Sequence, residues 1–258
     1  MSPLTSTDIE AIQQLLVQAG EIALHGLSAA AVSYKADHTP FTDVELAMEA
    51  HIIGFIESRF PGDQLITEEN GSRGAPSGRV WALDPIDGTK VYLNGLPTWG
   101  VSLGLLVEGQ PEAGFFYLPR THDFYWADSS RGAFLNTVRL SSRVKGQFDD
   151  PLAFLAVPTN VHRYYQVDYP RIRALGSTAA HLCYVAQGAA AGALTRRINL
   201  WDIAGVLPIL AQTGVQVEFL SGQSFSAADY LDGRRLPEEL LAAPPNLLPD
   251  LRSAIQRK

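Results

Sequence analysis

The sequence predicts a mixed α/β protein in which an α+β half, residues 1–147, is followed by an α/β half, residues 148–258. Helical periodicity at the N-terminus and a run of short strands in the middle predict the first half. Strands that alternate with helices after residue 150 predict the second half. We find no repeat, low-complexity tract or flexible linker between them, so we expect both halves to pack as one body.

Two amphipathic helices are expected near the N-terminus. Apolar residues recur at three- and four-residue steps over residues 9–23, behind Thr7 and Asp8 as cap residues. Residues 44–56 repeat the pattern after the loop "YKADHTPFT". His51 falls on the apolar face of this second helix, where a core histidine is expected rather than a metal ligand.

Short strands dominate the next section. "QLIT" and "GRVWALD" are expected to be strands, each running into a polar segment. From Trp99 onward, β-rich runs such as "WGVSLGLLVEG" and "PEAGFFYLP" are separated by Gly, Pro or Asp. This pattern predicts an antiparallel meander.

The second half begins near "QFDDP". "LAFLAVP" is expected to be a buried strand and "VQVEFL" another. Two helices are expected between them, over residues 177–193 and over residues 200–214 with Gly214 at the end. A last strand and a closing helix that begins near Asn246 complete the prediction.

Composition excludes several classes of function. The net charge of −7 argues against nucleic-acid binding, which needs a concentrated excess of Lys and Arg. The N-terminus lacks a basic segment followed by an apolar run, and no stretch approaches the roughly 18 apolar residues of a membrane span, so we expect a cytoplasmic protein without membrane association. Cys183 is the only cysteine and is expected to fill the core. An acidic protein that binds anions needs a local source of positive charge, and bound cations are one such source.

The segment "WALDPIDGT" carries the first candidate site. A turn at Pro85 can bring the carboxylates of Asp84 and Asp87 to one point, with the carbonyl of Ile86 as a third hard ligand of the kind Mg²⁺ accepts. Gly88 permits tight geometry there. Thr89 offers a hydroxyl at the start of a helical turn, and helix N-termini bind phosphate. A plain surface turn is the alternative, because Asp, Pro and Gly are common turn residues.

Two further acidic features join the argument. Glu68 and Glu69 follow a strand, and neighbouring strands that end in carboxylates can bring Glu68 close to Asp84. Such a nest of like charges is unfavourable until a metal fills it. Asp202 follows Trp201 at the head of an apolar helix. A solvated strand end and an ordinary first-turn acid are the alternatives for these two features.

Taken together, these pieces resemble the inositol monophosphatase-like family of lithium-sensitive, Mg²⁺-dependent phosphatases. "TEEN", "WALDPIDGT" and "LWDIAG" occur in the family's order, and "RALGSTAAHLCYVAQG" is similar to the segment before its last motif. The resemblance covers residue 8 to the C-terminus. It implies a layered αβαβα sandwich, a homodimer, two or three Mg²⁺ ions per site and a small phosphorylated substrate.

The resemblance also implies roles for individual residues. The implied metal ligands are Glu68, Asp84, the Ile86 carbonyl, Asp87 and Asp202. The implied substrate-binding residues are Gly88, Thr89, Gly176, Ser177, Thr195 and Arg196. The implied catalytic residues are Thr89, which would orient the attacking water, together with Glu45 and Glu68.

One position departs from the family pattern. Members commonly carry P-V-T-x-x-D before the second helix, and that Asp supports the Thr and the attacking water. Here "TPFTDVELA" puts Glu45 at the equivalent place and Asp43 two residues earlier. Either carboxylate can serve, and if neither reaches Thr89 we expect a weak enzyme.

The substrate stays open at this point. Relatives that handle inositol phosphate resemble one another in a Glu six residues before the Trp-Asp pair, and here that position is Thr195, followed by Arg196 and Arg197. The arginines either bind a second phosphate or are exposed charges. We expect a Mg²⁺-dependent phosphomonoesterase acting on a small polyol or sugar phosphate; the alternatives are a 3'(2'),5'-bisphosphate nucleotidase and a non-catalytic binding protein.

Overall fold

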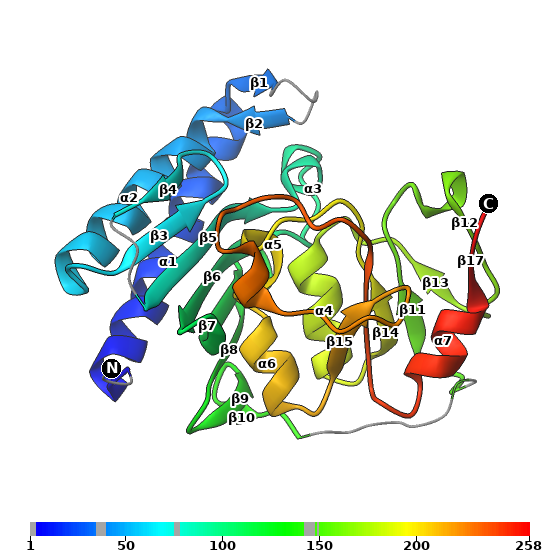
Figure 1. Ribbon diagram of the computed structural model, residues 1–258. Helices are drawn as coiled ribbons and strands as arrows, with labels where there is room; N and C mark the ends of the chain where they lie inside the picture. The colour runs from blue at the N-terminus through cyan, green and yellow to red at the C-terminus, as the bar shows by residue number, and fades with distance from the viewer. Residues whose placement is uncertain (1–3, 35–39, 75–77, 142–147, 149) are drawn as a thin grey trace.

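A computed structural model of the chain describes residues 4–34, 40–74, 78–141, 148 and 150–258. Its helices and sheets alternate in five layers, αβαβα, which confirms the expected fold class (Figure 1). Residues 35–39 of the predicted loop lie outside the described residues. So does residue 147, where the halves were expected to divide, and that boundary stays a prediction.

The first layer consists of the two predicted N-terminal helices, α1 (Ser6–Gly26) and α2 (Asp43–Arg59). Each begins with a capping box, Thr5 with Asp8 in α1 and Thr42 with Glu45 in α2. A short hairpin, β1 (Val32–Tyr34) with β2 (Pro40–Thr42), precedes α2. In the part of the chain that the structure describes, no helix is both long and apolar enough to cross a membrane.

The inward face of α2 differs from the predicted one. His51 is exposed, so its placement in the core was wrong, while Glu45 and Glu49 are buried. The apolar residues Met48 and Ile52 fit either of two adjacent faces. The helix turns its two glutamates inward because both carboxylates find hydrogen-bond donors there.

The second layer is an eight-stranded sheet in the order β10-β9-β8-β7-β6-β5-β3-β4. Its strands are β3 (Gln64–Thr67), β4 (Gly71–Arg73), β5 (Arg79–Asp87), β6 (Gly100–Val107), β7 (Gln110–Leu118), β8 (Asp123–Asp128), β9 (Gly132–Leu135) and β10 (Val138–Arg139). Strands β6 to β9 form the predicted antiparallel meander, and β5 and β10 extend it on either side. Strands β3 and β5 are parallel, so their carboxyl ends meet at one edge of the sheet.

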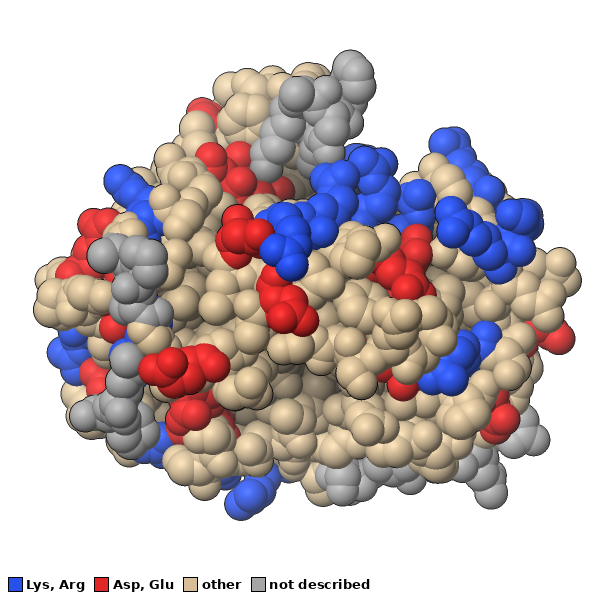
Figure 2. Space-filling view, viewed as in Figure 1, with Lys and Arg blue, Asp and Glu red and all other residues tan. Residues whose placement is uncertain are grey.

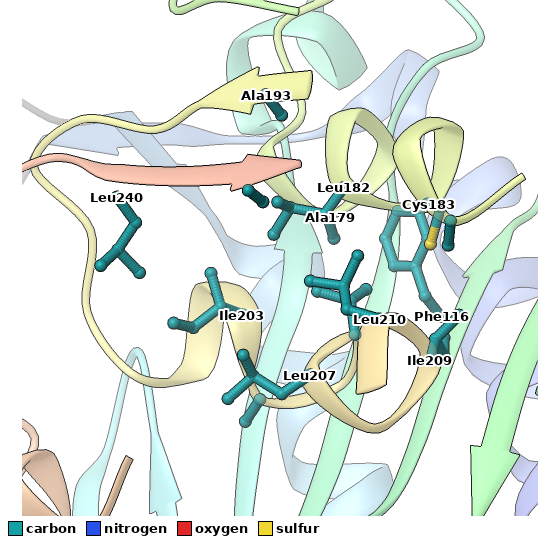
Figure 3. Close-up of a cluster of buried hydrophobic side chains, with 14 of the residues drawn as sticks. Phe116, Ala179, Leu182, Cys183, Ala193, Ile203, Leu207, Ile209, Leu210 and Leu240 are labelled. Atoms are coloured by element: carbon teal, nitrogen blue, oxygen red, sulfur yellow. The ribbon is translucent and has the colours of Figure 1, made fainter. Parts of the chain in front are cut away.

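The middle layer contains α4 (Thr178–Ala186), α5 (Trp201–Ala204) and α6 (Leu207–Gln212), packed between the two sheets (Figure 1). Figure 3 shows the apolar cluster where α4 and α6 meet, with Leu182 and Cys183 facing Ile209 and Leu210. The helix expected over residues 200–214 is broken into α5 and α6 at Gly205. There the chain lies so close to the first sheet that a Cβ on Gly205 would meet the Phe115 carbonyl oxygen at 2.7 Å.

The fourth layer is a five-stranded sheet in the order β13-β11-β14-β16-β15. Its strands are β11 (Phe154–Ala156), β13 (Ile172–Arg173), β14 (Ala190–Leu194), β15 (Gln216–Phe219) and β16 (Leu240–Ala243). The helix predicted over residues 177–193 therefore ran too far. Gly188, at φ 80°, follows its end, and the Ala- and Gly-rich run after it is a buried strand because only small side chains fit there: a Cβ on Gly192 would lie 2.6 Å from Leu251 Cδ1.

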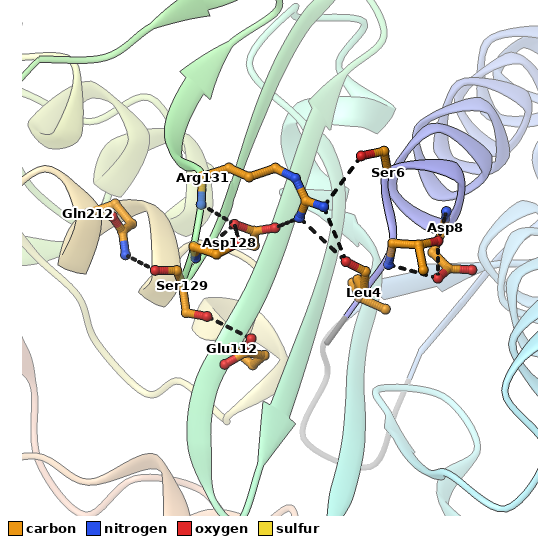
Figure 4. Close-up of polar contacts among 10 residues, drawn as sticks. Leu4, Ser6, Asp8, Glu112, Asp128, Ser129, Arg131 and Gln212 are labelled. Carbon is orange, nitrogen blue, oxygen red and sulfur yellow. Dashed lines mark hydrogen bonds and ion pairs between the residues drawn. The ribbon is translucent and has the colours of Figure 1, made fainter. Parts of the chain in front are cut away.

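Helix α7 (Leu248–Ala254) forms the last layer, near the predicted start at Asn246, and β17 (Ile255–Arg257) then pairs with β12 (Tyr165–Val167). At the opposite side of the molecule, polar contacts connect the layers (Figure 4). Arg131 joins Asp128 in an ion pair and lies 3.4 Å from both the Leu4 carbonyl and the Ser6 hydroxyl at the start of α1. These contacts fix the first helix against the turn between β8 and β9.

Candidate active site and metal centre

Three carboxylates from distant parts of the chain converge. One oxygen each from Glu68, Asp84 and Asp202 lies within 4.8 Å of the other two. Glu68 follows β3, Asp84 lies in β5 and Asp202 in α5. Three hard oxygen donors in one place are a donor set that suits Mg²⁺.

The fold explains this convergence. The Glu68 amide donates to the Leu83 carbonyl at 3.2 Å, which continues the parallel pairing of β3 with β5 and places Glu68 beside Asp84. Asp202 is brought in by the close approach of α5 to the sheet, where a Cβ on Gly104 would lie 2.7 Å from Ala204 Cβ. The Asn199 amide donates to Asp202 Oδ2 at 2.7 Å and orients its carboxylate.

Burial and like charge make this cluster costly without a cation. Asp84 is 2% exposed, and burial raises its pKa well above the ordinary range, with further increases from Glu68, Asp87 and Asp202. Burial likewise raises the pKa of Asp202, and the charge of Glu68 adds to the effect. A divalent cation at this point offsets the repulsion, so the residues present fit a metal centre.

The motif "DPID" lies at the end of β5 rather than in a free turn. The pairing of β5 with β6 shifts register between Asp84 and Asp87. Within this bulge the Ile86 amide donates to Asp84 Oδ1 at 3.0 Å, and the Ile86 carbonyl lies 3.4 Å from the Thr89 hydroxyl. Asp84 and Asp87 stay paired with Ser102 and Gly100 of β6, and the irregularity leaves only Pro85 and Ile86 between them out of the ladder.

Asp87 is placed apart from the three convergent oxygens. Its carboxylate accepts hydrogen bonds from the Ser177 hydroxyl and from the amides of Thr178 at 3.1 Å and Ala179 at 2.9 Å, at the start of α4. Burial raises its pKa to about 6, against the lowering effect of these hydrogen bonds. Asp87 nevertheless lines the same cavity as Glu68 and Asp202, so it connects this cavity with the start of α4.

Glu45, rather than Asp43, is the carboxylate that reaches Thr89. The Thr89 hydroxyl donates to Glu45 Oε1 at 2.8 Å, and the Thr42 hydroxyl donates to Oε2 at 2.9 Å. Asp43 instead accepts the Ala31 amide at 2.9 Å. Burial raises the pKa of Glu45 to about 7, although its hydrogen bonds with Thr89 and Thr42 act in the opposite direction.

Sequence reasoning missed Glu49, which is fully buried on the inward face of α2. Its carboxylate accepts from the Thr67 hydroxyl at 2.7 Å and from the Glu69 and Asn70 amides at 3.1 and 3.0 Å. It thereby fixes the turn that carries Glu68. The available signal was a Glu four residues after Glu45, at the edge of the apolar stripe of the helix.

The remaining candidates line two adjoining cavities. A cavity of about 370 Å³ is lined by Gly88, Gly176 and Arg196 as well as by the acids. The second, of about 620 Å³, shares Gly176 and Arg196 and adds Ser177 and Thr195. The Thr195 hydroxyl accepts the Leu240 amide at 3.2 Å, so the sheet already occupies this side chain.

Comparison with known proteins agrees with this geometry. Residues 4–256 match the model of the inositol monophosphatase family. A histidinol-phosphatase of Chlorobaculum parvum is 30% identical over 247 residues, covering 89% of this chain and 95% of the relative. A fructose-1,6-bisphosphatase/inositol-1-monophosphatase of Aquifex aeolicus is 31% identical over 204 residues, covering 74% of this chain and 76% of the relative.

The fold has a close counterpart among solved structures. The extragenic suppressor protein suhB of Bartonella henselae superposes with a TM-score of 0.84 at 22% identity, over 96% of this chain and 98% of that one. The resemblance inferred from the motifs is thus confirmed. The chain belongs to the inositol monophosphatase family and is a phosphoric monoester hydrolase.

Proposed function

We propose that this enzyme hydrolyses the phosphate monoester of a small polyol or sugar in a Mg²⁺-dependent reaction. The observation that carries the proposal is the convergence of Glu68, Asp84 and Asp202 beside the hydrogen bond between Thr89 and Glu45. We also propose that the metal-ligand and substrate-binding residues named from the family resemblance have these roles here. The proposal includes two or three Mg²⁺ ions per site.

A divalent ion held there supplies Lewis acidity toward water and phosphoryl oxygens. The protein's own groups do the rest. The Thr89 hydroxyl donates to Glu45, so its oxygen lone pairs remain available to accept a hydrogen bond from the attacking water. Glu45, with its pKa raised to about 7, takes up the proton that passes through Thr89.

Gly88 and Gly176 line the part of the smaller cavity in which the phosphate binds. Both have left-handed backbones, with φ of 97° and 88°, which glycine adopts without steric cost. A Cβ on Gly88 would lie 3.3 Å from the Gly176 carbonyl oxygen, and one on Gly176 would collide with Val91. A side chain at either position would therefore displace neighbouring protein atoms and disturb the two segments that border the proposed phosphate site.

The test is phosphate release from inositol 1-phosphate, fructose 1,6-bisphosphate and 3'-phosphoadenosine 5'-phosphate, with and without Mg²⁺. We expect Mg²⁺-dependent release from at least one of them, and its loss in Asp84→Asn. Absence of release from every substrate, with the protein folded, would contradict the proposal and favour a binding role. The third substrate tests the bisphosphate nucleotidase, which the arginines beside the cavity favour.

Homodimerisation, lithium sensitivity and a cytoplasmic location complete the proposal, all carried over from the family resemblance. Sedimentation equilibrium tests the dimer, since it predicts twice the chain mass of 28.0 kDa. Inhibition of phosphate release by millimolar LiCl, with NaCl as the control salt, tests the lithium sensitivity.

A further inference from the structure

Basic side chains surround the two cavities, although the chain carries a net charge of −7. Lys90 and Arg163 line the larger cavity, Arg197 and Arg235 line the smaller one, and Arg196 lines both. Figure 2 shows Lys and Arg side chains gathered along the upper part of the face in view, next to acidic ones. Although the net charge of the protein is negative, the lining of these cavities is locally rich in positive charge beside the acidic cluster.

Arg196 is held in place before any ligand binds. Its guanidinium lies 3.5 Å from the ring centroid of Tyr164, and its Nε lies 3.3 Å from Glu239 Oε1. That Nε is buried and makes no hydrogen bond among the described residues. Tyr164 is itself fixed, because its carbonyl accepts the Lys258 amide at 2.9 Å. A planar guanidinium fixed in this way loses little entropy when it binds an anion.

Arg197 has an unusual backbone. Its φ of 55° is left-handed, a conformation that costs a non-glycine residue free energy and that concentrates at binding sites. The side chain is exposed, and within the described part of the chain it forms no hydrogen bond or ion pair. No internal contact of the side chain therefore accounts for an arginine at this strained position.

Arg235 reaches the same cavity from another loop. The Leu236 amide donates to the Ile198 carbonyl at 2.9 Å, and the Asn199 side chain donates to the Gly233 carbonyl at 2.9 Å. These bonds join the loop of Arg235 to the loop of Arg197. Two segments of the chain thus contribute arginines to the lining of one cavity.

We infer that the substrate carries a second anionic group, a phosphate or a carboxylate, and that Arg196, Arg197 and Arg235 bind it. The inference rests on the proposed function, because the acidic cluster must bind the metal that engages the scissile phosphate. Guanidinium groups bind such anions through paired hydrogen bonds. The same three arginines repel an ammonium group, so phosphate esters of amino alcohols such as histidinol phosphate are disfavoured substrates.

Matched substrate pairs test the inference. Inositol 1-phosphate and inositol 1,4-bisphosphate differ by one phosphate, whereas glycerol 2-phosphate and 2-phosphoglycerate differ by one carboxylate. We expect kcat/KM to be about tenfold or more higher for the doubly anionic member of at least one pair, because a hydrogen bond to a charged group is worth that factor. The pair that shows the difference identifies the second group as phosphate or carboxylate.

Variants tie the preference to the arginines. Arg197→Asn removes the charge but tolerates the left-handed backbone, and Arg235→Gln removes the second charge. Each of these two variants should lower kcat/KM for the doubly anionic member of the substrate pair about tenfold more than for the singly anionic member. Arg234→Gln is the control, since Arg234 is exposed, pairs with Asp232 and lies outside both cavity linings; it should leave both values unchanged.

The outcomes separate this inference from the proposed function. Mg²⁺-dependent release with no preference in either pair, or with equal losses on both substrates in the arginine variants, would overturn the second-anion site and leave the phosphatase intact. Preference for histidinol phosphate would overturn it as well. Absence of release from every substrate would refute the proposed function, and the inference would fall with it.

Discussion

Substitution of Gly104 by alanine tests whether helix packing sets the geometry of the metal centre. Gly104 lies in β6 opposite α5, and an added Cβ would lie under 3.0 Å from the backbone carbon and oxygen of Ala204. Moving the Ala204 backbone carbon from 2.4 Å to the 3.4 Å of an ordinary contact takes about 1 Å. Asp202 precedes Ala204 by two residues on the same short helix and must move with it.

Two measurable losses follow from this displacement. Overpacking of a core costs typically about 1–3 kcal/mol of unfolding free energy. Misplacement of a reacting group by about 1 Å can cost on the order of 100-fold in rate, so we expect kcat/KM to fall about 10- to 100-fold. Urea unfolding measures the first loss, and Mg²⁺-dependent phosphate release per folded molecule measures the second.

Gly54→Ala is the matched control. Gly54 is exposed in the interior of α2, and a Cβ there meets no atom within 4 Å. The same chemical change should raise stability by up to about 1 kcal/mol through helix propensity and leave activity unchanged. If Gly104→Ala lowers stability but leaves the activity of the folded protein intact, the reasoning that links α5 packing to Asp202 is wrong.

Three further predictions concern the acidic residues. Asp87→Asn should abolish phosphate release with an unchanged circular dichroism spectrum; near-normal release would refute its assignment as a ligand. Millimolar Mg²⁺ should raise the melting temperature, since a metal at 100 times its Kd adds about 2.7 kcal/mol to the free energy of unfolding, and a chelator should reverse the rise; unchanged melting would count against the site. In metal-free protein, folding raises the pKa of Glu45 from 4.5 to about 7. Between pH 4.5 and 7 the folded state therefore binds more protons than the unfolded state, so the free energy of unfolding falls as the pH rises through this window. Glu45→Gln should reduce this fall by up to about 3 kcal/mol in urea titrations and lower kcat about 100-fold; an unchanged pH dependence would show that Glu45 does not carry the raised pKa.

The motifs predicted more of the chemistry than of the local backbone. Two neighbouring strands that each end in a carboxylate were enough to expect Glu68 close to Asp84, and the structure adds that these strands are parallel and end at a common edge. The helix predicted over residues 177–193 failed in its second part. The run from Ala190 to Leu194 has helix-forming composition, and its strand state depends on neighbouring strands and on Leu251, which lies almost 60 residues away in the sequence.

Glu49 and His51 illustrate a second limit. Periodicity identifies a stripe on α2 but leaves its width undefined, so a glutamate at the edge of the stripe and a histidine at the other edge compete for the interior. Hydrophobicity alone favours His51. The structure buries Glu49 because Thr67, Glu69 and Asn70 supply hydrogen-bond donors from a different segment, and such donors are invisible in a local window.

The centre depends on small residues as much as on acidic ones. Carboxylates at Glu68, Asp84 and Asp202 repel one another, and nothing in their own chemistry draws them together in the absence of a cation. Close packing does so, because Gly104 and Gly205 let α5 approach the backbone of the first sheet. The motif "WDIAG" therefore combines two requirements: an acid of the proposed metal site and, three residues later, a glycine that lets the helix carrying this acid approach the sheet. Apolar burial between the layers supplies the free energy that holds the charges together until a metal binds.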